Sequence, residues 1–271
     1  MDIKYICTSW GQGHLLIEEF LNKVMDAGFD GVEVNFPFDG KNTTPILDAI
    51  RNSGISFVAQ QYLPPMVETF EQYRNKMNNY LLQLAALNPV FINAHTGKDF
   101  YSIDENSILI GDCLSMIQKT GIKVVHETHR GRFTYHANSL LPYILRFQNL
   151  EFNADFSHFC VVSESLLEDQ EQILEKIIPR CRYIHARVGF SQAAQVNHPF
   201  APEWMATLER FVGWWQRIID GAKSRGESTF YICPEFGPAP YMPALPFTQQ
   251  PVSNQWDINV QMMNYLKKVL H

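Results

Sequence analysis

The segment HETHRGR (residues 126–132) carries a high density of charge directly after an apolar run that ends at Val125. A buried strand normally ends in a turn of Gly, Pro, Asn or Asp rather than in such residues. Its carboxylate and imidazoles could bind a metal ion, and its two guanidinium groups could bind an anionic group of a substrate. A solvated loop would have the same composition, so this segment alone leaves both interpretations open.

Polar side chains recur at the ends of other strand-like segments: Glu33, His95, Asp155, His158, His185, Arg187 and Glu235. Residues two apart on a strand point to the same face. If these faces line the interior of a barrel, Glu127, Asp155, His185 and Glu235 converge. Like charges a few ångströms apart raise one another's pKa strongly, so three carboxylates could not all stay ionised there without a cation. We therefore predict a divalent metal bound by these four residues.

The predicted ligand set limits the choice of metal. Three carboxylates and one imidazole suit a hard or borderline ion that keeps open positions for water or substrate. Mn²⁺, Zn²⁺, Mg²⁺ and Co²⁺ all meet this description. We take Mn²⁺ as the first expectation.

Eight β-rich segments are arranged at intervals along the chain, at residues 4–10, 31–36, 55–62, 90–95, 122–127, 150–156, 181–188 and 230–236. Helical spacing lies between them, for example at residues 15–28, 67–88, 105–121 and 163–178. Alternation of strand and helix indicates a parallel sheet. Because eight units fit this length and no Gly-x-Gly-x-x-Gly turn or P-loop occurs, we expect an α/β fold, a single (β/α)8 barrel over residues 1–271.

Composition excludes several classes of function. The formal net charge of −6 argues against a surface that neutralises nucleic acid. No signal peptide and no apolar run long enough to span a bilayer is present, so we expect no membrane partner. The odd number of cysteines, five, without a Cys-x-x-Cys pair fits neither a disulfide framework nor a zinc knuckle. A cytoplasmic protein is the simplest expectation.

Several motifs together resemble the xylose isomerase-like TIM-barrel superfamily, in particular its sugar isomerase/epimerase branch with tagatose epimerases and inosose dehydratase, which is related to the family 2 AP endonucleases. They are GFDGVEVNFP, VVHETHRGR, NADFSH, YIHARVGF, APEW and PEFGPAPYMPALPF. The resemblance covers nearly the whole chain. The metal-site pattern of this superfamily is a Glu after strand five, Asp-x-x-His after strand six, a His on strand seven and a Glu on strand eight. By resemblance it falls on Glu127, Asp155 with His158, His185 and Glu235.

The resemblance implies a reaction in which two glutamates exchange a proton next to the carbonyl of a metal-bound sugar. Glu127 and Glu235 would be ligands and acid/base groups, while His158 and Arg187 would hydrogen-bond the oxygens that gain charge. Alternatives stay open: His158 could only orient Asp155, and Arg187 could only pair with a carboxylate such as Glu235 or Glu33.

Further residues near the strand ends are candidates for substrate contact: His95, Arg130, Trp10 and Glu33. Two of them also have a purely structural alternative. His95 could be a core residue, and Glu33 could form an ion pair with Arg187. His129, Arg130 and Arg132 are expected to face substrate oxygens or to balance the acidity of the mouth. Because guanidinium groups bind phosphate and carboxylate, phosphorylated and unphosphorylated sugars or polyols both remain candidates.

Three other functions compete with isomerisation. An inosose-type dehydratase would use the same metal site and is the nearer rival. An AP endonuclease-like hydrolase would need additional histidines, yet the third strand offers Gln60 and Gln61. A barrel without activity could serve as a sugar-binding protein. The long segment at residues 189–204 is expected to form an active-site loop or a contact in a homo-oligomer.

Overall fold

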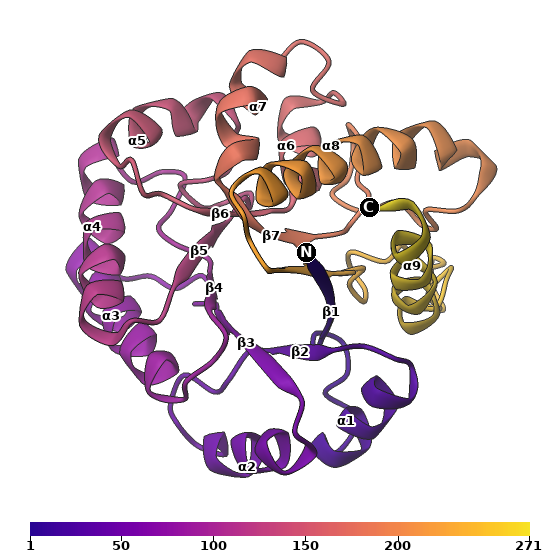
Figure 1. Cartoon of the computed structure of the whole chain (residues 1–271), viewed down its shortest axis with the longest axis horizontal. Coiled ribbons are helices and arrows are strands. Elements are labelled where there is room, and N and C mark those ends of the chain that lie inside the picture. Colours follow the sequence, from indigo (N-terminus) through magenta and orange to yellow (C-terminus); the bar gives the residue numbers. More distant parts are fainter.

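The eight strands of the chain close into one parallel barrel in which each strand pairs with its neighbours in sequence (Figure 1). The computed structural model describes all residues from 1 to 271. The strands are β1 (Asp2–Thr8), β2 (Gly31–Val34), β3 (Ser56–Gln61), β4 (Ile92–Ala94), β5 (Val124–Glu127), β6 (Phe152–Ala154), β7 (Cys181–His185) and β8 (Thr229–Cys233). The expected α/β barrel is confirmed, and each predicted β-rich segment contains or overlaps one strand.

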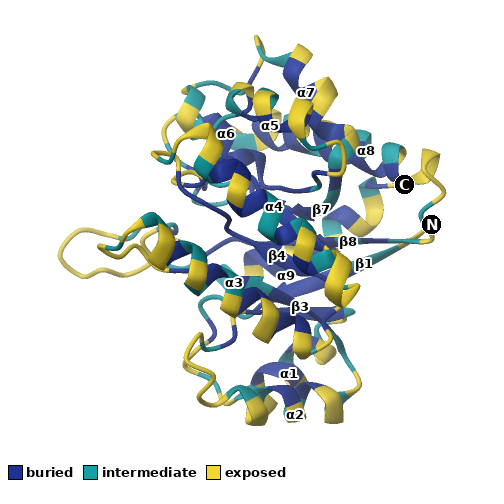
Figure 2. Ribbon diagram, turned by 90° about the vertical axis from the view of Figure 1, so that its left-hand side faces the viewer, coloured by how far each residue is buried: buried dark blue, intermediate teal, exposed yellow.

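Helices surround the barrel and turn their exposed residues outward (Figure 2). The α-helices are α1 (Ile17–Asp26), α2 (Thr43–Ser53), α3 (Phe70–Ala86), α4 (Ile103–Thr120), α5 (Leu141–Arg146), α6 (Phe156–Ser163), α7 (Glu171–Ile177), α8 (Met205–Ser224) and α9 (Gln255–Val269). Short 3-10 turns are η1 (Asn138–Leu140), η2 (Ile178–Arg180) and η3 (Pro202–Trp204). Side-chain caps begin several helices, as Thr69 does for α3 and Ser102 for α4. No helix combines the length and the apolar character needed to cross a membrane.

The helix expected at residues 163–178 is shorter than its pattern suggested. Its regular part is α7, Glu171–Ile177. Glu164 and Leu167 have φ angles of 48° and 57°. A left-handed conformation at a residue with a side chain costs about 1–2 kcal/mol and breaks the helical hydrogen bonding. Leu167 nevertheless lies fully buried, so packing against the core selects this turn over a continuous helix.

The apolar residues form two separate layers. Six of them, Ile6, Val58, Phe91, Val125, Tyr183 and Cys233, fill the barrel interior. A larger cluster of 64 buried residues lies between the strands and the surrounding helices. The interior layer closes the barrel axis below the carboxyl ends of the strands. Polar side chains that point inward at the next level can therefore be reached only from the mouth.

His126 illustrates the cost of burying a titratable group in the outer layer. Its Nδ1 lies 2.7 Å from the hydroxyl of Thr96, and its ring packs edge-on against Phe133 at 5.5 Å. The residue is 2% exposed. Burial lowers the pKa of the His126 imidazole to about 4. The ring therefore stays neutral in the folded protein at a pH where the unfolded chain would already be protonated.

This difference predicts an acid sensitivity that depends on His126. Because the folded pKa lies below the unfolded one, the unfolded state binds more protons between about pH 6.5 and pH 4, and stability falls as the pH falls through that interval. His126→Asn should flatten the dependence, removing up to about 3 kcal/mol of the acid-induced loss. The free energy of unfolding in urea, measured from pH 4 to 7 for wild type and variant, checks this. Parallel curves would contradict it, and His14→Asn, at an exposed position, serves as a control.

Candidate active site and metal centre

Four side chains converge at the mouth of the barrel, on its axis. One ligand atom each of Glu127, Asp155, His185 and Glu235 lies within 4.8 Å of the others. Glu127 and His185 end β5 and β7, Asp155 directly follows β6, and Glu235 lies two residues beyond β8. All four are at most 3% exposed. The structure therefore brings together every residue that strand alternation had grouped as metal ligands.

Asp155 is fixed by the start of α6. It is the N-cap of that helix, and its Oδ1 accepts from the amide of Ser157 at 3.2 Å and from the Ser157 hydroxyl at 2.5 Å. Its own amide donates to the Thr128 hydroxyl at 2.8 Å, which ties β6 to the end of β5. The remaining oxygen, Oδ2, contacts a guanidinium nitrogen of Arg187. Both carboxylate oxygens are thus oriented by the local fold.

His185 connects the four-residue cluster to Glu33. Its Nε2 lies 3.2 Å from Glu33 Oε2 and can donate to it. Its Nδ1 lies 2.8 Å from Glu235 Oε2 and 3.5 Å from Glu127 Oε2, but outside the angles of a hydrogen bond. A neutral ring that donates from Nε2 directs the lone pair of Nδ1 at these carboxylates. This arrangement fits a metal ligand whose other nitrogen is held by an outer carboxylate.

The pKa shifts of His185 and Asp155 indicate that the four-residue cluster holds more negative than positive charge. Burial acts against the charge of His185, but Glu235, Glu33 and Glu127 together raise its pKa well above the ordinary value. Burial raises the pKa of Asp155 to about 6, where Arg187 offsets only part of the effect of burial and of the neighbouring carboxylates. A divalent cation among these oxygens would relieve the repulsion. The residues present therefore could hold a divalent metal ion.

Arg187 is the fixed cation of the site. The side chain is 1% exposed, and its Nε donates to the Ser157 hydroxyl at 3.3 Å. Its Nη2 contacts Asp155, donates to His158 Nε2 at 2.9 Å and lies 3.6 Å from Glu235 Oε2. Of the two carboxylates considered as alternative partners of Arg187, Glu235 lies near it and Glu33 forms no ion pair with it. Glu33 instead contacts His185 from β2, which does not adjoin β7 in the barrel.

Two uncharged residues that were not among the predicted site residues, Asn93 and Asn153, also belong to the site. Asn93 Nδ2 donates to Glu127 Oε2 at 2.8 Å, and Asn153 Nδ2 donates to Asn93 Oδ1 at 3.1 Å. Both are fully buried. Each lies two residues before a polar strand end, His95 and Asp155, and so shares its inward face. Alternation by two places both amides on the inward face, but an amide is not by itself a candidate acid/base group.

A cavity of about 280 Å³ opens above these side chains. Both glutamates of the cluster, Arg187 and His95 line it together with three aromatic rings. The lining residues are Trp10, Asn35, Gln60, Tyr62, His95, Glu127, His129, Arg187, Glu235 and Tyr241. Of the other candidates, Glu33 and His158 lie behind this lining, His158 with no exposed surface. The cavity therefore combines titratable groups with flat apolar walls.

The aromatic wall is held by close backbone contacts. The ring of Trp10 meets Tyr241 edge-on, with centroids 4.9 Å apart. Gly237 lies against this ring so closely that a Cβ there would come within 2.1 Å of Trp10. Gln195 fixes the glycine by accepting from its amide at 2.7 Å and donating to its carbonyl at 3.2 Å. The long segment at 189–204 thus packs over the mouth and supports the wall.

The two arginines expected at the rim have different positions. Arg130 is exposed, and its guanidinium lies 5.1 Å from the centre of the Tyr241 ring. Arg132 is 3% exposed and donates to the carbonyl of Leu63 at 3.2 Å, so its expected place at the rim is wrong. The intervening Gly131, with φ of 75°, turns the chain back into the protein. Arg130 alone is available at this edge of the cavity.

Comparison with solved structures confirms the fold that the motifs suggested, that of xylose isomerase-like barrels. Three similar structures are a D-allulose 3-epimerase from Methylomonas sp. in complex with D-allulose (10% identity, TM-score 0.65, covering 99% of this chain and 97% of that one), a xylose isomerase-like TIM-barrel protein from Mycobacterium smegmatis in complex with magnesium (11%, 0.64, 98% and 96%) and a probable 3-DHS dehydratase from Bacillus anthracis (19%, 0.62, 97% and 98%). AP endonucleases share the fold as well. No family model and no curated protein sequence matches the chain.

The contact between Glu33 and His185 predicts how metal affinity depends on a residue outside the four-residue cluster. Glu33→Gln removes the charge that holds the His185 tautomer, and affinity for Mn²⁺ should fall by about 10–100-fold. Calorimetric titration of chelator-treated protein measures it. Glu209→Gln, an exposed position on α8, is the control and should bind as wild type does. Wild-type affinity in Glu33→Gln would mean that Glu33 does not support the metal ligands.

Proposed function

We propose that the protein is a divalent-metal-dependent sugar isomerase or epimerase that moves a proton next to a carbonyl group. The observation that carries this proposal is the position of Glu127 and Glu235. Both line the same cavity, and both belong to the buried cluster that could hold the metal. A protein that only bound sugar would have no need of two titratable carboxylates facing one ligand.

The two glutamates act as the acid/base pair. Burial raises the pKa of Glu127, but His95 and His185 outweigh this and hold it well below the ordinary value, so Glu127 is ionised. One glutamate removes the proton from the substrate carbon, and the other delivers a proton to the carbon that accepts it. Asp155 does not line the cavity, and its role is to hold the metal and to orient Arg187.

The metal would be held by Glu127, Asp155, His185 and Glu235, with Mn²⁺ as the first expectation. When bound, it would polarise the substrate carbonyl and stabilise negative charge that develops on oxygen, a contribution of several kcal/mol. The four residues supply three carboxylates and one imidazole, which suits such an ion.

Arg187 supplies a second, fixed positive charge to the substrate oxygen. Burial opposes its charge, but Asp155 and Glu235 keep its pKa above the ordinary value, so the guanidinium remains charged. Asp155, Ser157 and His158 hold it from behind while it faces the cavity. A preorganised charge of this kind favours an oxyanion without reorganisation during the reaction. In this arrangement His158 is a positioning residue for Arg187.

The cavity is suited to a small sugar or polyol. Its volume of about 280 Å³ lies at the lower end of the range for small-molecule pockets. Trp10, Tyr62 and Tyr241 would cover the apolar faces of such a ligand. His95, 3.1 Å from Glu127, and the exposed Arg130 would contact substrate oxygens at opposite sides. A terminal phosphate or carboxylate on the substrate would be placed at Arg130.

Dehydration is the second candidate, because the same carboxylates could remove a proton next to a ketone and the similar structures include a probable dehydratase. Hydrolysis of nucleic acid is disfavoured by the net charge of −6 and by Gln60 at the end of β3.

The metal-loaded protein should be incubated with a panel of ketoses and with inosose in D₂O. Deuterium entering one carbon at unchanged connectivity supports an isomerase or epimerase, while loss of water selects the dehydratase. Binding without exchange or turnover would leave a sugar-binding protein.

Replacement of one base predicts a specific loss. Glu235→Gln should reduce exchange of the substrate's α proton with solvent by about 10²–10⁴-fold, because an amide cannot accept the proton, while the barrel stays folded. Proton NMR in D₂O measures the exchange, and circular dichroism checks the fold. Glu209→Gln is the matched control. Exchange at the wild-type rate in Glu235→Gln would remove Glu235 from the base role.

A further inference from the structure

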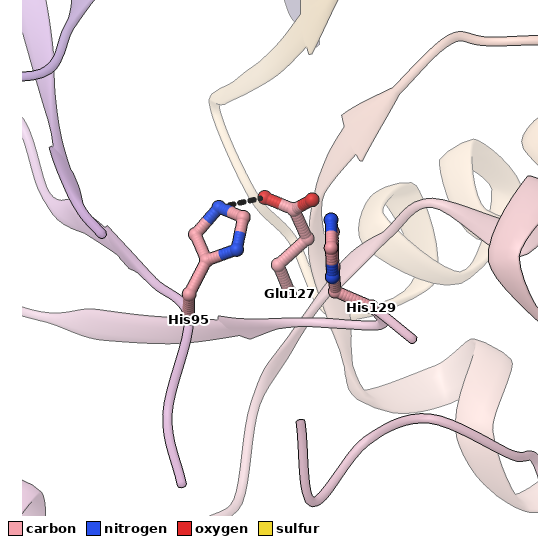
Figure 3. Close-up of side chains that lie close together, drawn as sticks. All are labelled: His95, Glu127 and His129. Atoms are coloured by element: carbon pink, nitrogen blue, oxygen red, sulfur yellow. Dashed lines mark ion pairs between the residues drawn. The ribbon is translucent and has the colours of Figure 1, made fainter. Parts of the chain in front are cut away.

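A second group of potential metal ligands adjoins the first and shares one member with it. Ligand atoms of His95, Glu127 and His129 lie within 4.8 Å of one another. Figure 3 shows both imidazoles flanking the Glu127 carboxylate, one on each side. All three side chains line the cavity. Asp155, His185 and Glu235 complete the first group but do not belong to this one.

The hydrogen bonds of His129 leave the correct nitrogen free for a metal. Its Nδ1 lies 2.5 Å from the carbonyl oxygen of Arg130, so this nitrogen carries a proton and donates it. In the neutral ring Nε2 then presents its lone pair, 3.5 Å from the Tyr241 hydroxyl. A backbone carbonyl bonded to one nitrogen fixes which nitrogen can bind a metal. The backbone at His129 is itself fixed, because its amide donates to the Thr134 hydroxyl at 3.2 Å.

His95 approaches the same carboxylate from β4. Its Nε2 lies 3.1 Å from Glu127 Oε2 and 3.3 Å from the Gln60 amide nitrogen. Its Nδ1 is buried and has no partner, so no outer group selects its tautomer. His95 is therefore less well organised as a ligand than His185, which Glu33 supports. We expect an ion in this group to bind more weakly than an ion in the first.

We propose that His95, Glu127 and His129 form a second divalent-cation site, suited to Zn²⁺, which shares Glu127 with the first site. Two imidazoles and one carboxylate are a typical ligand set of zinc sites with an open position. The proposal rests on the geometry of these side chains, and its test needs no substrate and no turnover. It therefore stands or falls separately from the proposed isomerase activity.

Sharing of Glu127 has a chemical consequence. A cation bound at a carboxylate lowers its pKa and so weakens it as a base. An ion at the second site would also occupy a wall of the cavity that the substrate is proposed to use. The second ion is therefore expected to compete with the substrate for His95, rather than to assist proton transfer.

The stoichiometry of Zn²⁺ tests the second site directly. Chelator-treated full-length protein is dialysed to equilibrium against Zn²⁺ and analysed for zinc and for protein. Wild type should bind two ions per chain, whereas His129→Asn and His95→Gln should each bind one. His136→Asn removes a histidine from the same β5–α5 segment that does not line the cavity, and it should retain two. Circular dichroism verifies that each variant is folded.

Electron paramagnetic resonance of the wild type gives an independent readout that needs no variant. Two Mn²⁺ ions that share the Glu127 carboxylate should show a magnetically coupled spectrum, and one ion alone should not. A single zinc ion in the saturated wild type, or two ions in both His129→Asn and His95→Gln, would overturn the second site. His185→Ala removes a ligand of the first site only, so this variant should retain one zinc ion, and loss of both ions would contradict a second site with its own ligands.

Discussion

The repulsion among buried carboxylates is the constraint on which the rest of the site depends. Glu33, Glu127, Asp155 and Glu235 are each at most 3% exposed, and water screens such charges poorly. A different neighbouring group reduces the repulsion at each carboxylate. Arg187 pairs with Asp155, His185 lies between Glu33 and Glu235, and Asn93 donates to Glu127. The fixed groups still leave an acidic cluster, which is why the arrangement suits a divalent cation.

The barrel fold is stable enough to hold several charged side chains close together. Parallel strands end at one mouth, and the pleat sends every second side chain inward. The six-residue apolar layer that includes Val125, Tyr183 and Cys233 closes the axis directly beneath Glu127, His185 and Glu235. The same register that buries the apolar residues therefore places each polar residue two positions later at the mouth. The apolar layers below the mouth stabilise the barrel, while the close like charges at the mouth repel one another.

How much could be predicted from the sequence follows from this register. The barrel and the four-residue cluster were predictable, because strand rhythm and alternation by two are local properties. Asn93 was missed because an amide carries no charge, although it has the same spacing. Arg132 was placed wrongly because Gly131 reverses the chain, and His158 lies behind Arg187 because α6 begins directly after Asp155. Turns and helix starts depend on tertiary packing, which the pattern of residue types does not contain.

The two proposed acid/base groups, Glu127 and Glu235, have different surroundings. Asn93 donates to Glu127 at 2.8 Å, and His95 lies 3.1 Å away, which stabilises the ionised carboxylate and makes it a weak base. Glu235 Oε2 lies 2.8 Å from His185 Nδ1 and 3.6 Å from Arg187 Nη2, so its neighbours are two groups that the metal and the substrate oxygen would also engage. In the proposed reaction the ionised glutamate removes the proton, and the other must carry a proton before it can deliver one, so the two glutamates exchange these roles between the forward and the reverse direction.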